Sequence, residues 1–243
     1  MRTPMKKMML FALGLLCGLP LRAPAADGIL AWAKPAGGTG SDVSHGIASL
    51  ADGSFLVTGS FEGATTFGPG ETHQTTLVSA GESDIFIARY NADGTLAWAR
   101  RAGGVHACGA YGVAALADGS FLVTGYFADM ATFGPGDPKE TILTSKGALD
   151  IFVARYHADG TLAWAKRAGG MSAEQAYGVA AFADGSSCIA GEFWGAATFE
   201  PGEPGETTLT PTGSSDMFIA RYRADGTLAW ARQIGRASCG ERV

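Results

Sequence analysis

A segment of 66 residues recurs along this chain of 243 residues, and this repeat constrains the fold more than any other feature. Residues 28, 94, 160 and 226 each open one copy of a Gly-x-Leu-Ala-Trp-Ala segment. The segment ADGSFLVTG at 51–59 returns at 117–125, and more loosely at 183–191. The repeat predicts three complete units at 28–93, 94–159 and 160–225, with the start of a fourth at 226–233.

Each unit carries the pattern of four β-strands. In the second unit, runs rich in strand-forming residues end at two Asp-Gly pairs, Asp118-Gly119 and Asp159-Gly160, which are strong hairpin signals. We therefore expect strands A to D at 111–116, 121–127, 151–156 and 161–166, joined as A–B and C–D hairpins. The segment 128–149 between strands B and C is expected to form a tight turn and a small extra hairpin. No segment shows helical periodicity.

The faces of the predicted strands indicate how the sheets pack. Strand C of the second unit places Ile151 and Val153 on one face and Phe152, Ala154 and Tyr156 on the other, so both faces are apolar. A sheet buried on both faces must lie between similar sheets, which is typical of a β-propeller. We expect an all-β fold, a propeller-like array of four-stranded antiparallel blades. A β-solenoid is disfavoured, because its coils are shorter and lack paired Asp-Gly hairpins.

The number of units predicts an incomplete propeller. A closed propeller has about 4–8 blades, and three units are fewer than that. We therefore expect the chain to be a fragment of a longer protein, with apolar blade faces that favour self-association.

Composition excludes several other classes of protein. Glycine accounts for 36 of 243 residues, which argues against a helical bundle, because each glycine in a helix interior costs about 1 kcal/mol. Hydrophobic residues make up 47% and charged residues 17%, so the chain has enough apolar surface to fold. The net charge of -5 is opposite to that expected of a nucleic-acid-binding protein.

The two ends of the chain read differently from the repeats. Residues 1–25 resemble a secretory signal peptide, with a basic start, an apolar run at 8–19 and a cleavage pattern at Ala23-Pro24-Ala25. The apolar run is too short for a membrane span, which needs about 20 residues. We expect a secreted, periplasmic or cell-surface protein without a span in the mature chain. Residues 234–243 leave the repeat and resemble a translated sequencing adapter, so we expect an unstructured, non-native tail.

The repeat unit resembles a known family. The motifs Ala-Arg-Tyr, Ala-Asp-Gly, Leu-Ala-Trp, Ala-Gly-Gly and Val-Thr-Gly together look like the bacterial SBBP-type β-propeller repeat, in a long 66-residue variant. The resemblance covers about residues 26–233. It implies a β-propeller fold in an exported or surface protein, and it implies no catalytic residue. The third strand B departs from the pattern at Cys188 and is expected to be weaker.

Repeated charged residues are one candidate for a site. Asp84, Asp150 and Asp216 recur once per unit, each followed five residues later by an arginine. They could form a ring that binds an ion, or structural contacts between blades; recurrence in every unit favours the structural role. The histidines and Cys108 and Cys188 match no metal or disulfide pattern. We therefore predict no catalytic residue, no metal and no cofactor.

Two residues stand out as candidates for partner binding. Trp32, Trp98, Trp164 and Trp230 share one phase of the repeat and are interpreted as core, whereas Trp194 stands alone. Packing is the favoured role for Trp194, with binding of a sugar or partner as the alternative. The second candidate is His106. It lies in a loop between strands D and A, where the units diverge. The units diverge most in two sets of loops: 39–44, 105–110 and 171–176 between strands D and A, and 71–83, 137–149 and 203–215 between strands B and C.

Two classes of function remain open. The first is an exported, non-catalytic propeller that serves as a structural or binding scaffold for an unknown protein or glycan. The second is a fragment of a propeller enzyme, a lyase or hydrolase, with its site at the central channel. Strand A is rich in Gly and Ala and carries little asymmetric polarity, which favours the scaffold.

Overall fold

The structure is a computed structural model that describes residues 30–234. The predicted signal peptide and nearly all of the adapter-like tail lie outside the described residues. The chain divides into two units, residues 1–33 and 34–243. Residues 30–33 of the first unit form no strand, and all described strands belong to the second. Within the described residues there is no helix, and hence none that could cross a membrane.

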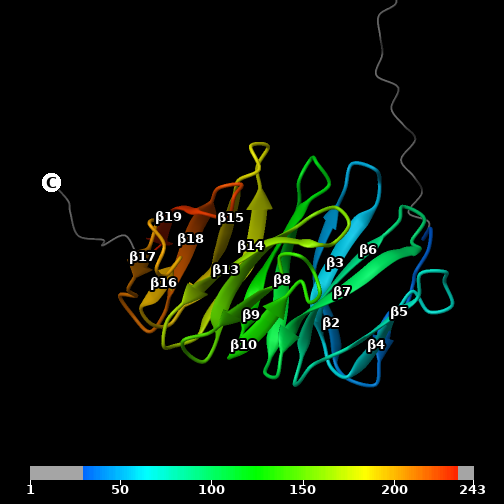
Figure 1. The fold of residues 1–243 in the computed structure, drawn as a ribbon, viewed down its shortest axis with the longest axis horizontal. Coiled ribbons are helices and arrows are strands. Elements are labelled where there is room, and N and C mark those ends of the chain that lie inside the picture. The colour runs from blue at the N-terminus through cyan, green and yellow to red at the C-terminus, as the bar shows by residue number, and fades with distance from the viewer. Residues whose placement is uncertain (1–29, 235–243) are drawn as a thin grey trace, which may run out of the picture. The chain divides into compact units, whose positions relative to one another are not determined.

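The second unit contains three four-stranded antiparallel groups, which we call modules (Figure 1). Their strands occupy the predicted positions A to D, and neighbouring strands in each module pair in the order A-B-C-D. The first module consists of β2 (Asp42–Ser49), β3 (Phe55–Phe61), β6 (Asp84–Tyr90) and β7 (Leu96–Gly104). The second consists of β8 (Cys108–Ala115), β9 (Phe121–Phe127), β12 (Asp150–Tyr156) and β13 (Leu162–Gly169). The third consists of β14 (Glu174–Ala181), β15 (Ser187–Phe193), β18 (Asp216–Tyr222) and β19 (Leu228–Ile234).

The all-β, antiparallel architecture expected from the sequence is confirmed. The expected weakness of the third strand B does not shorten it, because β15 has seven residues, as do β3 and β9. That the modules form an incomplete propeller stays a prediction.

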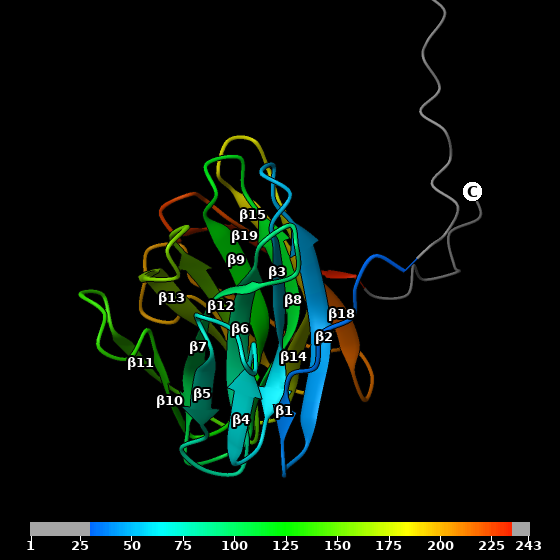
Figure 2. The same ribbon diagram turned by 90° about the vertical axis from the view of Figure 1, so that its right-hand side faces the viewer.

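The segments between strands B and C form the expected small hairpins. These are β4 (Ala64–Phe67) with β5 (Thr75–Val78), β10 (Met130–Phe133) with β11 (Thr141–Thr144), and β16 (Ala197–Phe199) with β17 (Thr207–Leu209). Each hairpin extends a sheet that began earlier in the chain. β10 pairs with β7 and β16 pairs with β13, while β4 pairs with the short strand β1 (Gly37–Gly38; Figure 2). The second and third hairpins therefore link consecutive modules.

The Ala-Gly-Gly motif explains where the hairpins cross. A Cβ atom at Gly104 would clash with the carbonyl oxygen of Met130, and one at Gly170 would clash with that of Ala196. Only glycine allows the backbones to approach this closely. The motif at the end of each D strand is therefore a requirement of the joint between modules.

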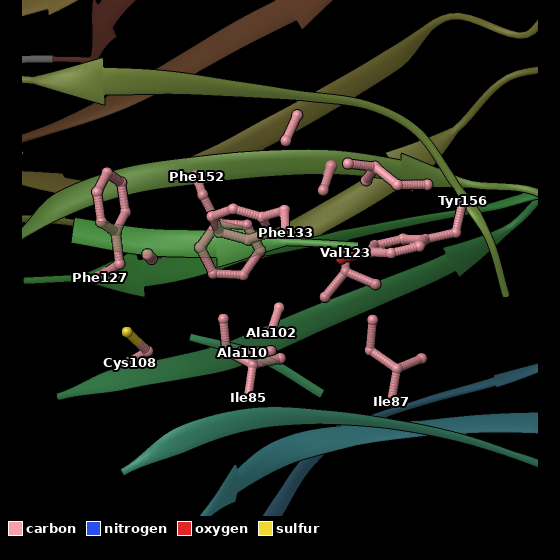
Figure 3. Packing of buried hydrophobic residues seen from close by; sticks show 14 of the residues in the cluster. Ile85, Ile87, Ala102, Cys108, Ala110, Val123, Phe127, Phe133, Phe152 and Tyr156 are labelled. Carbon is pink, nitrogen blue, oxygen red and sulfur yellow. The ribbon is translucent and has the colours of Figure 1, made fainter. Parts of the chain in front are cut away.

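The largest hydrophobic cluster lies between the first two modules. Ile85 and Ile87 of β6 pack against side chains of the second module that include Phe127, Phe152 and Tyr156 (Figure 3). The opposite face of β6 is also buried, because Phe86 belongs to a cluster formed by the first module and the hairpin of β4 and β5. Burial of both faces is what the apolar pattern predicted, and each large side chain removed from water contributes roughly 1.5–3 kcal/mol.

The interpretation of the in-phase tryptophans as core residues needs correction. Trp98, Trp164 and Trp230 are half-buried, and Trp32 in the first unit is 39% exposed. Trp98 stacks on Phe121 of the second module, with ring centroids 6.0 Å apart. Strand D is the last of the four strands of a module. Its tryptophan therefore packs between its own module and the next one, and not in the interior of its own module.

Candidate binding surface

The repeated aspartates are held by partners that the sequence spacing did not suggest. Asp84 is fully buried and accepts a hydrogen bond from Arg101 Nη1 at 2.6 Å, and Asp150 accepts one from Arg167 Nη1 at 2.7 Å. Burial raises the pKa of both carboxyl groups, although the arginines oppose this. The arginine five residues further on points elsewhere, since Arg89 contacts Asp52. These contacts agree with the structural role favoured from the sequence.

A row of aromatic rings joins the A strands. His45 of β2 lies edge-on to Tyr111 of β8 at 4.9 Å, and Tyr111 lies 5.4 Å from Tyr177 of β14. The three residues occupy the same phase of the repeat.

The diverging loops meet at one place in each module. The loop that leads from strand D to strand A lies beside the residue that follows strand B. Ala128 N donates to Ala107 O at 3.0 Å in the second module, and Trp194 N donates to Ala173 O at 3.2 Å in the third. The two sets of variable loops are also in direct contact, since Glu82 N donates to Val105 O at 3.1 Å and Ala148 N donates to Ser172 O at 3.0 Å.

The joint between the first and second modules carries His106. Its Nδ1 lies 3.7 Å from Glu82 Oε1, and its Nε2 lies 3.8 Å from Asp129 Oδ2. The imidazole is half exposed between these two carboxylates. Val105 precedes His106 in the chain, and Met130 begins β10, which pairs with β7. The side chains of Val105 and Met130 are both exposed.

The equivalent joint between the second and third modules carries Trp194. Its side chain is 38% exposed, and that of Met171 is 81% exposed. A Cβ atom at Gly195 would clash with Ser172 Oγ, so the two loops are in close contact there. We define the junction surface as the exposed side chains at these two joints: Val105, His106, Met130, Met171 and Trp194.

Sequence reasoning missed Glu174, which begins β14. The residue is fully buried; its Oε2 accepts a hydrogen bond from Gly170 N at 2.8 Å, and its Oε1 has no partner within the described residues. Burial raises the pKa of this carboxyl to about 7, and the nearby charge of Asp150 adds to the shift. The sequence does show that this position of the repeat varies, because Asp42 and Cys108 occupy it in the other units. That variation was the only sign of Glu174 in the sequence. As the side chain is closed to solvent, Glu174 does not present itself as a catalytic group.

The other chemistry-bearing residues have structural surroundings. Cys108 is buried, which raises the pKa of its thiol to about 12, and Cys188 is a half-buried free thiol. Between residues 30 and 234, no group of three or more His, Cys, Asp or Glu side chains could hold a metal ion.

Comparisons with known proteins agree with this architecture. Residues 74–96 match the model of a β-propeller domain of unknown function, DUF5122. The chain is also similar to the regulatory protein FlaEY of Caulobacter vibrioides, with 27% identity over 146 residues. That alignment covers 60% of this chain but only 15% of the relative. Together with the antiparallel modules, the matches support a β-propeller repeat protein, while the SBBP type stays a prediction.

Proposed function

We propose that this protein is a non-catalytic scaffold that binds a partner protein or glycan through the junction surface. The observation that carries the proposal is the presence of exposed apolar side chains at each of the two joints. Val105 and Met171 lie in loops in which the repeat units diverge, and Met130 and Trp194 lie just after strand B. The modules provide a buried, repeated framework, and such frameworks commonly carry function on their loops.

The composition of the junction surface supports binding. Val105, Met130 and Met171 are each more than half exposed, and large exposed apolar groups that gather together mark interaction sites. Tryptophan and methionine are enriched in protein interfaces, and a partly exposed indole can also stack on a sugar ring. His106 with its two carboxylates would add a polar rim.

The wider context supports the same role. A β-propeller fold suggests a scaffold, and the relative from Caulobacter is named a regulatory protein. Export, as expected from residues 1–25, would present the junction surface to partners outside the cytoplasm. This placement is part of the proposal.

The test compares three forms of the full chain in a glycan array and in a pull-down from the producing organism. The first form is the wild type, the second is the double variant Met171→Ser/Trp194→Ser, and the third is the control Ile47→Ser. Ile47 is exposed on β2, outside both sets of variable loops. A ligand bound by the wild type and by the control, but lost in the double variant, supports the proposal. Ligands that bind all three forms equally would refute it.

A further inference from the structure

Three side chains from separate segments meet at the joint between the first and second modules. Glu82 lies just before β6, His106 lies between β7 and β8, and Asp129 lies between β9 and β10. The imidazole stands between the two carboxylates, with Nδ1 3.7 Å from Glu82 Oε1 and Nε2 3.8 Å from Asp129 Oδ2. We call these three residues the carboxylate–histidine trio.

The second joint shows that the fold does not need this trio. The same phases of the repeat are occupied there by Ala148, Ser172 and Gly195. The strands nevertheless pair in the same way at both joints, because β16 pairs with β13 as β10 pairs with β7. Charged residues that hold the fold, such as Asp84 and Asp150, recur from unit to unit. The trio is therefore an addition to the repeated framework.

Both carboxylates of the trio are available to a partner. Their side chains are 68% exposed at Glu82 and 61% exposed at Asp129. Neither carboxylate accepts a hydrogen bond from a described residue, since the distances to the imidazole exceed the usual range of about 2.7–3.2 Å. With a neutral imidazole, the trio carries two negative charges without a lysine or arginine of the described residues in ion-pair contact.

Exposed apolar side chains lie on both sides of the trio. Val105 precedes His106 and is 66% exposed, and Met130 follows Asp129 and is 54% exposed. Backbone contact keeps the loops together, because Glu82 N donates to Val105 O at 3.1 Å. The first joint therefore presents acidic and apolar groups side by side, whereas the second joint presents apolar groups without the acids.

We propose that the first joint binds a basic segment of a partner protein. A lysine or arginine of this segment lies between Glu82 and Asp129, and its apolar neighbours pack on the two exposed apolar side chains. Charge complementarity selects this partner, because a cationic head group donates several hydrogen bonds to carboxylates that are otherwise unengaged. A glycan is less favoured here, because the indole on which a sugar could stack, that of Trp194, belongs to the second joint. The inference rests on the proposed function, since it names the partner of one part of the junction surface.

The probe is a phage-displayed library of random linear peptides, selected on the immobilised full chain. We expect the selection to enrich lysine or arginine next to apolar residues. The best peptide is then labelled with fluorescein and titrated by fluorescence anisotropy. Its affinity should fall about tenfold in the variant Glu82→Gln/Asp129→Asn, the effect of losing charge-assisted hydrogen bonds. The affinity for the wild type should also fall as the salt concentration rises.

The matched control is Glu62→Gln/Glu203→Gln, which removes two exposed carboxylates outside the junction surface and reproduces the change in net charge. This control should leave the affinity unchanged. The variant Glu82→Lys/Asp129→Asn should instead bind a peptide in which glutamate replaces the basic residue. Asparagine is used at position 129 because it tolerates the positive φ of 54° found there. Thermal melts check that all variants are folded.

Failure to select a saturably binding peptide would overturn the inference, as would equal affinity of the wild type and Glu82→Gln/Asp129→Asn. A neutral glycan that binds the wild type and is lost in the same variant would assign the first joint to a sugar, and would also overturn it. The proposed function is tested separately by Met171→Ser/Trp194→Ser. A ligand lost in that variant but retained in Glu82→Gln/Asp129→Asn would refute this inference and leave the proposed function standing.

Discussion

Replacing Glu174 by glutamine should make the protein more stable at neutral pH and remove part of its pH dependence. The carboxyl group is fully buried beside Asp150, and one of its oxygens has no hydrogen-bond partner within the described residues. Ionisation at this position is therefore unfavourable. Glutamine keeps the size of the side chain and an oxygen that can accept from Gly170 N, but it carries no charge.

The magnitude follows from the raised pKa of Glu174. In the folded protein this pKa is about 7, against 4.5 for an unperturbed glutamate side chain. Between these two values the folded state holds a proton that the unfolded state has released, so the free energy of unfolding falls as pH rises. At about 1.4 kcal/mol for each pKa unit, the cost above pH 7 reaches at most roughly 3 kcal/mol. Below pH 4.5 both states increasingly hold the proton, and the cost disappears.

The assay is urea unfolding followed by tryptophan fluorescence, at pH values on either side of this window. The wild type should lose stability from pH 5 to pH 7.5, and Glu174→Gln should lose distinctly less. The matched control is Glu203→Gln, which removes one exposed carboxylate from the hairpin of the same repeat unit and reproduces the change in net charge. Equal pH slopes in the wild type and Glu174→Gln would refute the reasoning, as would a glutamine variant that is less stable at pH 7.5.

Three further predictions concern the joints and the absence of a metal requirement. Trp164→Ala should lower the free energy of unfolding by about 3 kcal/mol, because it removes packing against the third module. Trp194→Ala should lower it much less, and equal unfolding midpoints of the two variants in urea would contradict this prediction. Gly160→Ala should cost about 1–3 kcal/mol through its positive φ, and an unchanged thermal midpoint would show that the turn can relax. Excess chelator should leave the melting temperature unchanged, and a large decrease would reveal a structural metal.

The strands of each module could be predicted with little error, because they depend on local signals. The expected strand at 121–127 coincides with β9, and both Asp-Gly pairs form the expected turns. Strand A of the second unit begins at Cys108, three residues before the expected Tyr111, since its first residues are glycine and alanine with weak strand preference. The loops in which the units diverge were also visible, because internal repetition provides its own comparison.

The partners of individual side chains could not be predicted in the same way. The spacing suggested Arg89 for Asp84, whereas Arg101 on the neighbouring strand holds that carboxylate. Strand pairing brings residues of distant sequence number together, and several arginines were available at similar spacing. Glu174 went unnoticed for the same reason: its fully buried position depends on the contact between two modules.

The sequence by itself determined the repeat, the four strands of each unit and their hairpin turns, because these depend on residue preference and on periodicity along the chain. Only the tertiary structure decided that each B–C hairpin joins the preceding sheet and that the in-phase tryptophans pack at the joints between modules. It also decided that the Ala-Asp-Gly turn between strands C and D packs against an arginine and a tryptophan of the preceding module. Alternation along a strand shows that both faces are buried, but it does not show which module covers them. That choice is made by packing between residues about 66 positions apart.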